Sequence, residues 1–221
     1  MTNLADPARA SYPRSEMTDS DGNGSGGGLG LETSHGQPIP DKRQRLVEGA
    51  RLVLHQQGVE KTTLADIAQA ADVPVGNVYY YFKTKDELVQ AVIDAHAQDI
   101  QTMLASFDRH RSPKARLKAL VRALTDQREL VARHGCPHGT LCSELNKRDD
   151  DLERATPILM QLLIDWVEQQ FRSMGRRDAR DLAVAMIAAY QGIMLLTNTF
   201  RQPELIVREA RRLDRWIDSL A

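Results

Sequence analysis

Cysteine is scarce in this sequence, with two in 221 residues, which excludes a secreted scaffold held together by disulfides. No basic segment followed by an apolar run opens the chain, so a signal peptide is not expected. Long apolar runs are also missing. The longest extends from Leu182 to Leu196, short of the roughly 18 residues that a membrane span needs. We therefore expect a cytoplasmic protein with no membrane segment.

The chain also lacks an excess of charge of either sign. It holds 29 Lys and Arg against 30 Asp and Glu, so its net charge is −1. A strongly basic balance would indicate a nucleic-acid partner, and this composition does not. Aromatic residues make up 5%, whereas the hydrophobic share of 42% is enough to build a core. Any role in nucleic-acid binding must therefore rest on a motif.

Residues 1–40 have almost no apolar periodicity and contain a glycine-rich run at 21–30, so we interpret them as a disordered arm. From Asp41 onward, apolar residues recur with a period near 3.6, and no sustained alternation of the strand type is present. The predicted fold class is all-α, with about nine helices joined by short connections.

The expected helix boundaries follow from capping and breaking residues. Thr84 with Glu87 three residues later predicts a capping box for a long helix that reaches about Phe107. Helices are expected to end at the glycines Gly58, Gly135 and Gly175. Helices are expected to begin at the prolines Pro113, Pro157 and Pro203.

The segment 62–85 is the most informative. Thr63 can cap a short helix, Asp72 with Val73 makes a tight turn, and a second short helix begins at Pro74. Two short helices joined by a tight turn form a helix-turn-helix, whose second helix lies in the major groove of DNA. The residues that would face the groove are Val75, Gly76, Asn77 and Tyr79.

On pattern alone, an alternative stays open in which these are two ordinary packed helices with no role in DNA binding. Capped amphipathic helices occur in any all-α protein, and the run Tyr-Tyr-Tyr-Phe can be core. The longer pattern is more specific: Gly58-x-x-x-Thr-Thr-Leu-x-Asp-Ile-Ala-x-x-Ala-x-Val73-x-x-Gly76-x-x-Tyr79-x-Tyr-Phe82-x-x-Lys85-x-x-Leu88. It resembles the N-terminal signature of the TetR family of bacterial transcriptional regulators. The close match covers residues 43–88, and beyond it the resemblance is architectural.

The resemblance implies a role for each matching position. Base contacts are implied for Val75, Gly76, Asn77 and Tyr79, and phosphate contacts for Thr62, Thr63, Tyr80, Tyr81 and Lys85. Side-chain chemistry agrees, because an Asn amide can pair with an adenine edge and a lysine can bind phosphate. Two positions depart from the family pattern: Asp72 stands where Gly is common, and Pro74 stands where a Ser cap is common. Losing that hydroxyl puts one phosphate contact in doubt.

The resemblance also implies a DNA-binding domain at 41–88 and a ligand-binding and dimerisation domain at 89–221. The helix from about Asp178 to Phe200 is apolar almost all round, so it must be covered on more than one side. In the family, the last two helices form an intersubunit four-helix bundle, so we expect a homodimer through them. The alternative for the last helix is an ordinary core helix within one chain.

A small, mostly apolar effector is implied by the resemblance more than by the residues themselves. Bulky or polarizable side chains that can line its pocket are His96, Met103, Phe107, Arg128, Trp166, Tyr190 and Met194. At helical spacing, each of them is more often plain core than ligand wall.

The stretch 134–142 carries two histidines and both cysteines. The structural interpretation is a helix end near Gly135, a restart at Gly139 and Thr140, and Cys142 as a small buried side chain. Two further interpretations stay open: a redox pair of Cys136 and Cys142, or a metal site that adds His134 and His138. A disulfide requires a loop between the cysteines, because a continuous helix would hold them too far apart.

The sequence therefore predicts a homodimeric repressor that binds a double-stranded DNA operator and is released by a small ligand. We expect no enzyme activity, no cofactor and no metal. The alternative function is a redox- or metal-responsive regulator that senses through Cys136 and Cys142 with His134 and His138. A helical scaffold that binds only protein would show no salt-dependent affinity for DNA.

Overall fold

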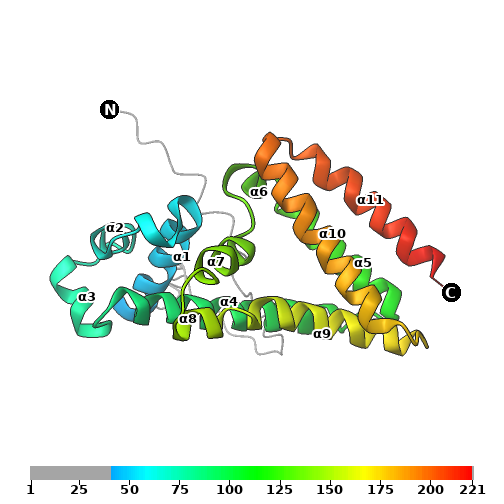
Figure 1. The fold of residues 1–221 in the computed structure, drawn as a ribbon, viewed down its shortest axis with the longest axis horizontal. Coiled ribbons are helices and arrows are strands. Elements are labelled where there is room, and N and C mark those ends of the chain that lie inside the picture. The colour runs from blue at the N-terminus through cyan, green and yellow to red at the C-terminus, as the bar shows by residue number, and fades with distance from the viewer. Residues whose placement is uncertain (1–40, 221) are drawn as a thin grey trace, which may run out of the picture. The chain divides into compact units, whose positions relative to one another are not determined.

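The computed structural model describes residues 41–220, and the expected disordered arm at 1–40 lies outside them. Within the described part, every regular element is a helix, so the all-α prediction is confirmed (Figure 1). The elements are α1 (Lys42–Lys61), α2 (Leu64–Ala70), α3 (Val75–Tyr81), α4 (Lys85–Phe107), α5 (Pro113–Asp126), α6 (Arg128–His134), α7 (Pro137–Leu145), α8 (Asp151–Ala155), α9 (Ile158–Ser173), α10 (Ala179–Phe200) and α11 (Glu204–Ser219).

Over residues 41–220 this makes eleven helical segments, where the periodicity predicted about nine. The additional segments come from short breaks. Gln127 is both the C-cap of α5 and the N-cap of α6, so a single residue separates these two helices. α8 is a five-residue helix capped by Asp150. The restart after Gly135 also differs from the expectation, because α7 begins at Pro137 rather than at Gly139 and Thr140.

Side-chain caps start several helices where the sequence predicts them. The Thr63 hydroxyl accepts the Asp66 N–H, and the Asp66 carboxylate accepts the Thr63 N–H, which completes a capping box for α2. Thr84 caps α4 in the same way, with its hydroxyl accepting the Glu87 N–H at 3.1 Å. The expected box at α4 is not closed, because the Glu87 carboxylate accepts the N–H of Lys83, one residue before the cap, at 2.7 Å.

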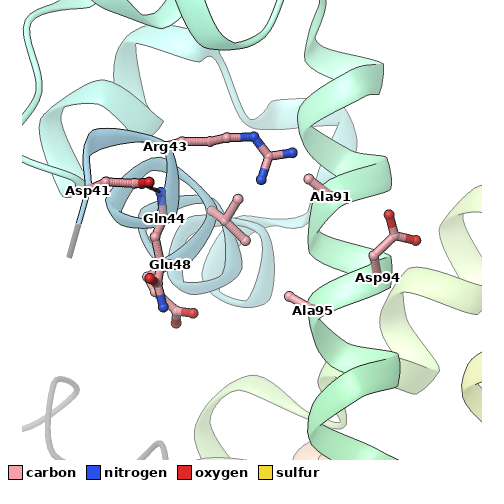
Figure 2. A pocket seen from close by; sticks show the side chains of 8 residues that line it. Asp41, Arg43, Gln44, Glu48, Ala91, Asp94 and Ala95 are labelled. Atoms are coloured by element: carbon pink, nitrogen blue, oxygen red, sulfur yellow. Dashed lines mark hydrogen bonds between the residues drawn. The ribbon is translucent and has the colours of Figure 1, made fainter.

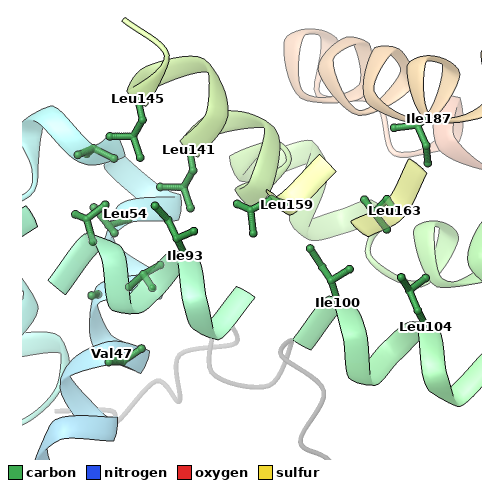
Figure 3. Packing of buried hydrophobic residues seen from close by; sticks show 14 of the residues in the cluster. Val47, Leu54, Ile93, Ile100, Leu104, Leu141, Leu145, Leu159, Leu163 and Ile187 are labelled. Atoms are coloured by element: carbon green, nitrogen blue, oxygen red, sulfur yellow. The ribbon is translucent and has the colours of Figure 1, made fainter. Parts of the chain in front are cut away.

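One hydrophobic cluster extends from α1 through α4, α9 and α11. On α4, the residues Leu88, Val89 and Val92 are fully buried at the end near α1 to α3, and Ile100 and Leu104 are buried farther along. Figure 3 shows α4 side chains in this cluster together with those of α7 and α9. The predicted domain boundary at residue 88 falls near the start of α4, which packs against α1, α5, α8 and α9. The division into two domains stays a prediction.

The membrane expectation needs one correction. By length and composition, α10 is apolar enough to cross a membrane, with an 18-residue window of mean hydropathy 1.4. The apolar run from Leu182 to Leu196 underestimated its length, because the residues from Thr197 to Phe200 extend the helix without adding charge. One such helix is weak support for a span, since the core helix of a soluble protein passes the same test. In this fold α10 packs against α6, α9 and α11.

Gly58 bends α1 near its C-terminal end. Its φ of 83° lies in the left-handed region, where a side chain is strained, and an added Cβ would also meet the Glu144 carboxylate at 2.7 Å. The bend removes helical partners from two backbone groups. The Thr62 hydroxyl donates to the Gly58 carbonyl, and the Val59 N–H donates to the Glu144 carboxylate, both at 2.6 Å. Gly58 therefore ends the regular part of α1, as the sequence predicts.

Two histidine pairs lie where α1 and α4 meet α6 and α7. The rings of His55 and His134 pack edge to face, with centroids 5.6 Å apart, and those of His96 and His138 do the same at 4.9 Å. The His55 Nε2–H donates to the Gly135 carbonyl at 2.9 Å. Burial lowers the pKa of all four histidines and brings that of His138 to about 4, with the positive charge of Arg51 as a further cause. These histidines are therefore neutral in the folded protein near pH 7.

We expect the free energy of unfolding to fall as the pH drops below the ordinary histidine value of 6.5. Between that value and about 4, the unfolded chain protonates His138 and the folded protein does not, so acid favours unfolding. The slope from one such group is at most about 1.4 kcal/mol per pH unit. Denaturant titrations at about pH 7 and about pH 5 measure it. The His138→Gln variant should lose less stability between the two, and equal losses would contradict this role.

Candidate DNA-binding site

The turn between α2 and α3 has the backbone that a helix-turn-helix requires. Asp72 has φ of 52°, so it adopts the left-handed conformation that Gly takes most readily and that Asp tolerates. Its carbonyl accepts a hydrogen bond from the Arg45 guanidinium at 2.9 Å, which ties the turn to α1. Pro74 precedes α3 and supplies no side-chain cap, as expected from the missing Ser hydroxyl.

A small core orients α3. Val78 is fully buried, and Phe82 is 3% exposed, so these two residues form the inward face of α3, as their spacing of four residues in the sequence favours. They share a cluster with Ile67 and Ala68 of α2. α2 also packs closely on α1, because a Cβ added at Gly49 would lie 2.9 Å from the Ala71 nitrogen. The small residues at this crossing thus let α2 pack closely on α1. Because α3 packs on α2 through Val78 and Phe82, its opposite side faces outward.

The predicted base-contacting residues lie together on that outward side. Val75 is 47% exposed and Tyr79 is 54% exposed, although both are large apolar or aromatic side chains. Nothing lies within 4 Å of a Cβ built on Gly76, and Asn77 is half-buried beside them. Exposed apolar side chains on a seven-residue helix that is anchored on its other face are available to contact a partner.

The predicted phosphate-contacting residues differ in how exposed their side chains are. Tyr80 is 77% exposed, and Tyr81 is half-buried against the core, with the two rings edge to face. Lys85 lies at the start of α4, with its Nζ 3.4 Å from the Glu60 carbonyl. Thr63 is exposed in the α2 capping box, whereas Thr62 is 1% exposed and bonded to Gly58. The structure thus groups four of the five near the surface and places Thr62 inside.

Sequence reasoning passed over two cations beside α3. Lys83 is exposed directly after α3 and donates from Nζ to the Tyr79 carbonyl at 2.8 Å, which satisfies a helix-end acceptor. Arg43 of α1 lies over the Phe82 ring, 5.1 Å from its centroid. Lys83 could have been identified from the sequence, because it directly precedes the Thr84 cap. Arg43 gave none, because its contact joins residues that are far apart in the sequence.

A hydrogen-bonded carboxylate supports the start of α2. The Asp66 carboxylate accepts from both the hydroxyl and the N–H of Thr63, at 2.7 and 2.9 Å. These bonds, with the hydroxyl first, lower the pKa of Asp66 below its usual value. The capping box therefore stays closed at neutral pH.

An open groove of about 370 Å³ lies between α1 and α4 (Figure 2). Three carboxylates, one guanidinium, one amide and three small apolar side chains line it. The lining residues are Asp41, Arg43, Gln44, Val47, Glu48, Ala91, Asp94 and Ala95. None of the seven predicted effector-binding residues is among them.

Those seven residues lie in separate parts of the fold. His96 pairs with His138, while Phe107 packs edge to face on Trp166, at a centroid distance of 6.0 Å. Met103 packs on the main core, whereas Tyr190 and Met194 belong to a second cluster with Ile206. Arg128 donates to the Thr125 carbonyl at the break between α5 and α6. Their assignment to one effector pocket stays a prediction.

The two cysteines belong to one continuous helical segment. Cys136 is the N-cap of α7, and Cys142 lies within that helix, so their Cα atoms are about 9 Å apart by helix geometry. A disulfide needs roughly 4.4–6.8 Å, so the loop on which the redox interpretation depended is absent here. Burial raises the pKa of both thiols, that of Cys142 to about 11, which disfavours the reactive thiolate.

Metal binding at the same stretch gains no support. Among residues 41–220, no group of three or more His, Cys, Asp or Glu side chains is arranged to hold a metal ion. Both interpretations of the stretch 134–142 that involve sensing chemistry therefore lack the geometry they need.

Comparison with known proteins agrees with this architecture. A family model described as bacterial regulatory proteins, tetR family, matches residues 46–92. The uncharacterized HTH-type transcriptional regulator in the lacX 3' region of Lactococcus lactis subsp. lactis is 27% identical over 175 residues, which are 72% of this chain and 84% of that one. The HTH-type transcriptional repressor DhaR of Mycobacterium sp. (strain GP1) is 29% identical over 174 residues, covering 73% and 85%.

A solved structure extends the agreement to the whole described fold. The regulatory protein TetR from Rhodobacter sphaeroides superposes with a TM-score of 0.70 at 26% identity, covering 79% of this chain and 97% of its own. The family model accounts for the helix-turn-helix, and the superposition accounts for the helices that follow it. The chain belongs to the TetR family of bacterial transcriptional regulators, and α2 and α3 are its helix-turn-helix for binding DNA.

Proposed function

We propose that this regulator is a homodimeric repressor that binds a palindromic operator and is released by a small, mostly apolar effector. The observation that carries the proposal is the outward face of α3, where Val75, Tyr79 and Tyr80 are exposed while Val78 and Phe82 anchor the helix. A helix held in this way can enter a major groove without rearrangement. The repressor role is supported by the name of the relative DhaR. Like its relatives, it acts as a regulator and not as an enzyme.

Base reading is assigned to Val75, Gly76, Asn77 and Tyr79. The Asn77 amide can make paired hydrogen bonds to an adenine edge, and Val75 can contact a thymine methyl. Gly76, with open space where its Cβ would be, lets the backbone of α3 approach the bases.

Phosphate contacts are assigned to Thr63, Tyr80, Tyr81 and Lys85, together with Lys83. Thr63 precedes α3, Tyr80 and Tyr81 are its last two residues, and the two lysines follow it. Thr62 has a structural role in this scheme, because its hydroxyl is committed to the Gly58 carbonyl. The cations supply affinity for any DNA sequence, and the groove-facing residues supply selectivity.

The proposed dimer forms through the outer face of α10. Its exposed large side chains are Val184, Leu195, Leu196 and Phe200. Small residues lie between them, and nothing is within 4 Å of a Cβ built on Gly192, so a second helix can approach closely. The outer face of α11, in contrast, carries arginines.

The apolar side of α11 is used within the chain. Ile206, Leu213 and Ile217 are buried in the single protomer, where α11 packs on α5 and α10. This corresponds to the core-helix alternative for α11. In the proposed dimer, α10 provides the apolar contact and α11 flanks it.

Effector release is proposed to work by a shift in population. The effector would bind the C-terminal helices in a state in which the two α3 helices no longer match successive major grooves, about 34–36 Å apart. Couplings of this kind are typically about 1–3 kcal/mol. A cytoplasmic location is part of the same proposal, because the operator is there.

Selection of bound sequences from random double-stranded DNA with the purified protein tests the function. The proposal expects a palindromic site whose affinity falls steeply with salt concentration. Failure to enrich any sequence, together with affinity that does not depend on salt, would leave a helical scaffold as the better description.

We expect Asn77→Ala and Tyr79→Ala each to weaken binding to the selected operator by about 1–3 kcal/mol, which is the usual value of a lost base contact. Dimerisation should not change, because both side chains lie on the outer side of α3. Fluorescence anisotropy with the operator and with a scrambled duplex measures the effect. Equal affinity of both variants and the wild type for the operator would refute the base-reading assignment.

Lys85→Ala is expected to weaken binding to operator and scrambled DNA alike, since a phosphate contact carries no sequence information. The slope of log K against log salt should become shallower by about one. The control is Arg111→Ala, an exposed cation just beyond the far end of α4, which should leave the slope unchanged. A change in sequence preference with an unchanged slope would contradict the phosphate role.

The substitution Leu195→Glu places a charge on the proposed dimer face, where Leu195 is 66% exposed in the protomer. Burying an unpaired carboxylate is costly, so the dimer dissociation constant should rise by roughly tenfold or more. Sedimentation equilibrium measures it. Ile158→Glu, a control on an exposed residue of α9, should leave the dimer intact. A dimer that tolerates Leu195→Glu as well as the control would exclude this face.

A further inference from the structure

We infer that Glu144 of α7 is a positioning residue for DNA binding, because it holds the corner between α1 and α2 at a defined place relative to α10. The inference rests on the proposed function, in which two heads must reach two half-sites at once. It concerns a side chain that lies outside the helix-turn-helix and that the family pattern at 43–88 does not include.

The contact is made at the bend of α1. The Val59 N–H loses its helical acceptor because of Gly58, and the Glu144 carboxylate accepts it at 2.6 Å. Hydrogen bonds to an ionised acceptor are shorter and stronger than neutral ones. Gly58 leaves the space that the carboxylate fills, since an added Cβ would lie 2.7 Å from Glu144 Oε1. The bend therefore supplies both the N–H that the Glu144 carboxylate accepts and the space that the carboxylate occupies.

The same corner leads directly into the helix-turn-helix. Three residues after Val59, the Thr62 hydroxyl closes back onto the Gly58 carbonyl, and Thr63 then caps α2. Lys85 donates to the carbonyl of Glu60 between them. A displacement of the Val59 N–H would move this whole turn, and with it the start of α2.

Two further contacts join the α6–α7 region to the head on either side of Glu144. The His55 Nε2–H donates to the Gly135 carbonyl at 2.9 Å, one turn before the bend in α1. Beyond α7, the Arg148 guanidinium pairs with Asp86 in the first turn of α4 at 2.6 Å. Glu144 lies between these two contacts in sequence and is the one that meets the corner itself.

At its other end, α7 meets α10. A Cβ added at Gly139 would lie 2.8 Å from Gln191 Oε1, so the α7 backbone packs directly on this α10 side chain. Gln191 also donates to the Met160 sulfur of α9 at 3.3 Å. Because the exposed face of α10 is the proposed dimer contact, α7 links the dimer helix to the DNA-binding head. Glu144 thereby helps to set the distance between the two heads.

Binding to two half-sites exceeds binding to one by about 10²–10⁴ only when the geometry lets both heads engage together. The experiment therefore compares a duplex carrying the whole selected operator with one carrying a single half-site. In Glu144→Ala, whole-operator affinity should fall by about tenfold, within the usual range of about 5–150-fold for such couplings. Affinity for the half-site should stay close to that of the wild type, because each head keeps its own core.

Two conservative variants test the mechanism. Glu144→Gln keeps an acceptor of the same length and should retain most of the whole-operator affinity. Glu144→Asp keeps the charge but is one methylene too short to reach the Val59 N–H, so it should behave like Glu144→Ala. The control is Asp149→Ala, an exposed acid just beyond α7, which should match the wild type on both duplexes. Thermal melting and sedimentation establish that each variant is folded and dimeric.

A parallel loss on both duplexes would overturn the inference, since it would indicate general destabilisation of the head. Unchanged binding of Glu144→Ala to both duplexes would overturn it as well. If Glu144→Ala does not fold, the comparison of Asp with Gln decides, and equal behaviour of the two refutes the role. A wild type that prefers neither duplex would instead refute the proposed dimeric function.

Discussion

Burial of the apolar side of α4 is the constraint on which the rest of this structure depends. Its first turns bury Leu88, Val89 and Val92 near α1 to α3, and the turns that follow bury Ile100 and Leu104 in the same hydrophobic cluster as α9. Each of these side chains contributes roughly 1.5–3 kcal/mol when it is removed from water. α4 therefore joins the helix-turn-helix to the C-terminal helices through one shared hydrophobic core.

Specificity for DNA places the opposite demand on α3. This helix must expose apolar and aromatic side chains, which ordinarily lowers stability in water, and it spans only Val75–Tyr81. Val78 and Phe82 compensate by packing on α2, while the Arg45 guanidinium and the left-handed Asp72 hold the turn before it. The outward side of α3 is thus supported by contacts with other helices.

The polar groups at the junction of α1, α4, α6 and α7 have a related role. Arg51 is buried there with Glu48 and Asp99 as partners, beside histidines that burial keeps neutral. The buried guanidinium needs these partners, because a lost partner leaves a desolvated polar group. These contacts tie α1 to α4 and α4 to α7 at the junction.

The sequence by itself determined those features that depend on residues three or four apart. Thr63 and Thr84 as caps, Gly58 as a helix end and the inward pair of Val78 and Phe82 were predictable, because capping and amphipathic packing are local. The tertiary structure alone decided which polar groups meet across the fold. It paired Glu144 with the N–H of Val59, 85 residues away, placed Thr62 inside and turned the apolar side of α11 onto α5. Such contacts depend on how helices cross, and the order of residues along one helix does not specify that.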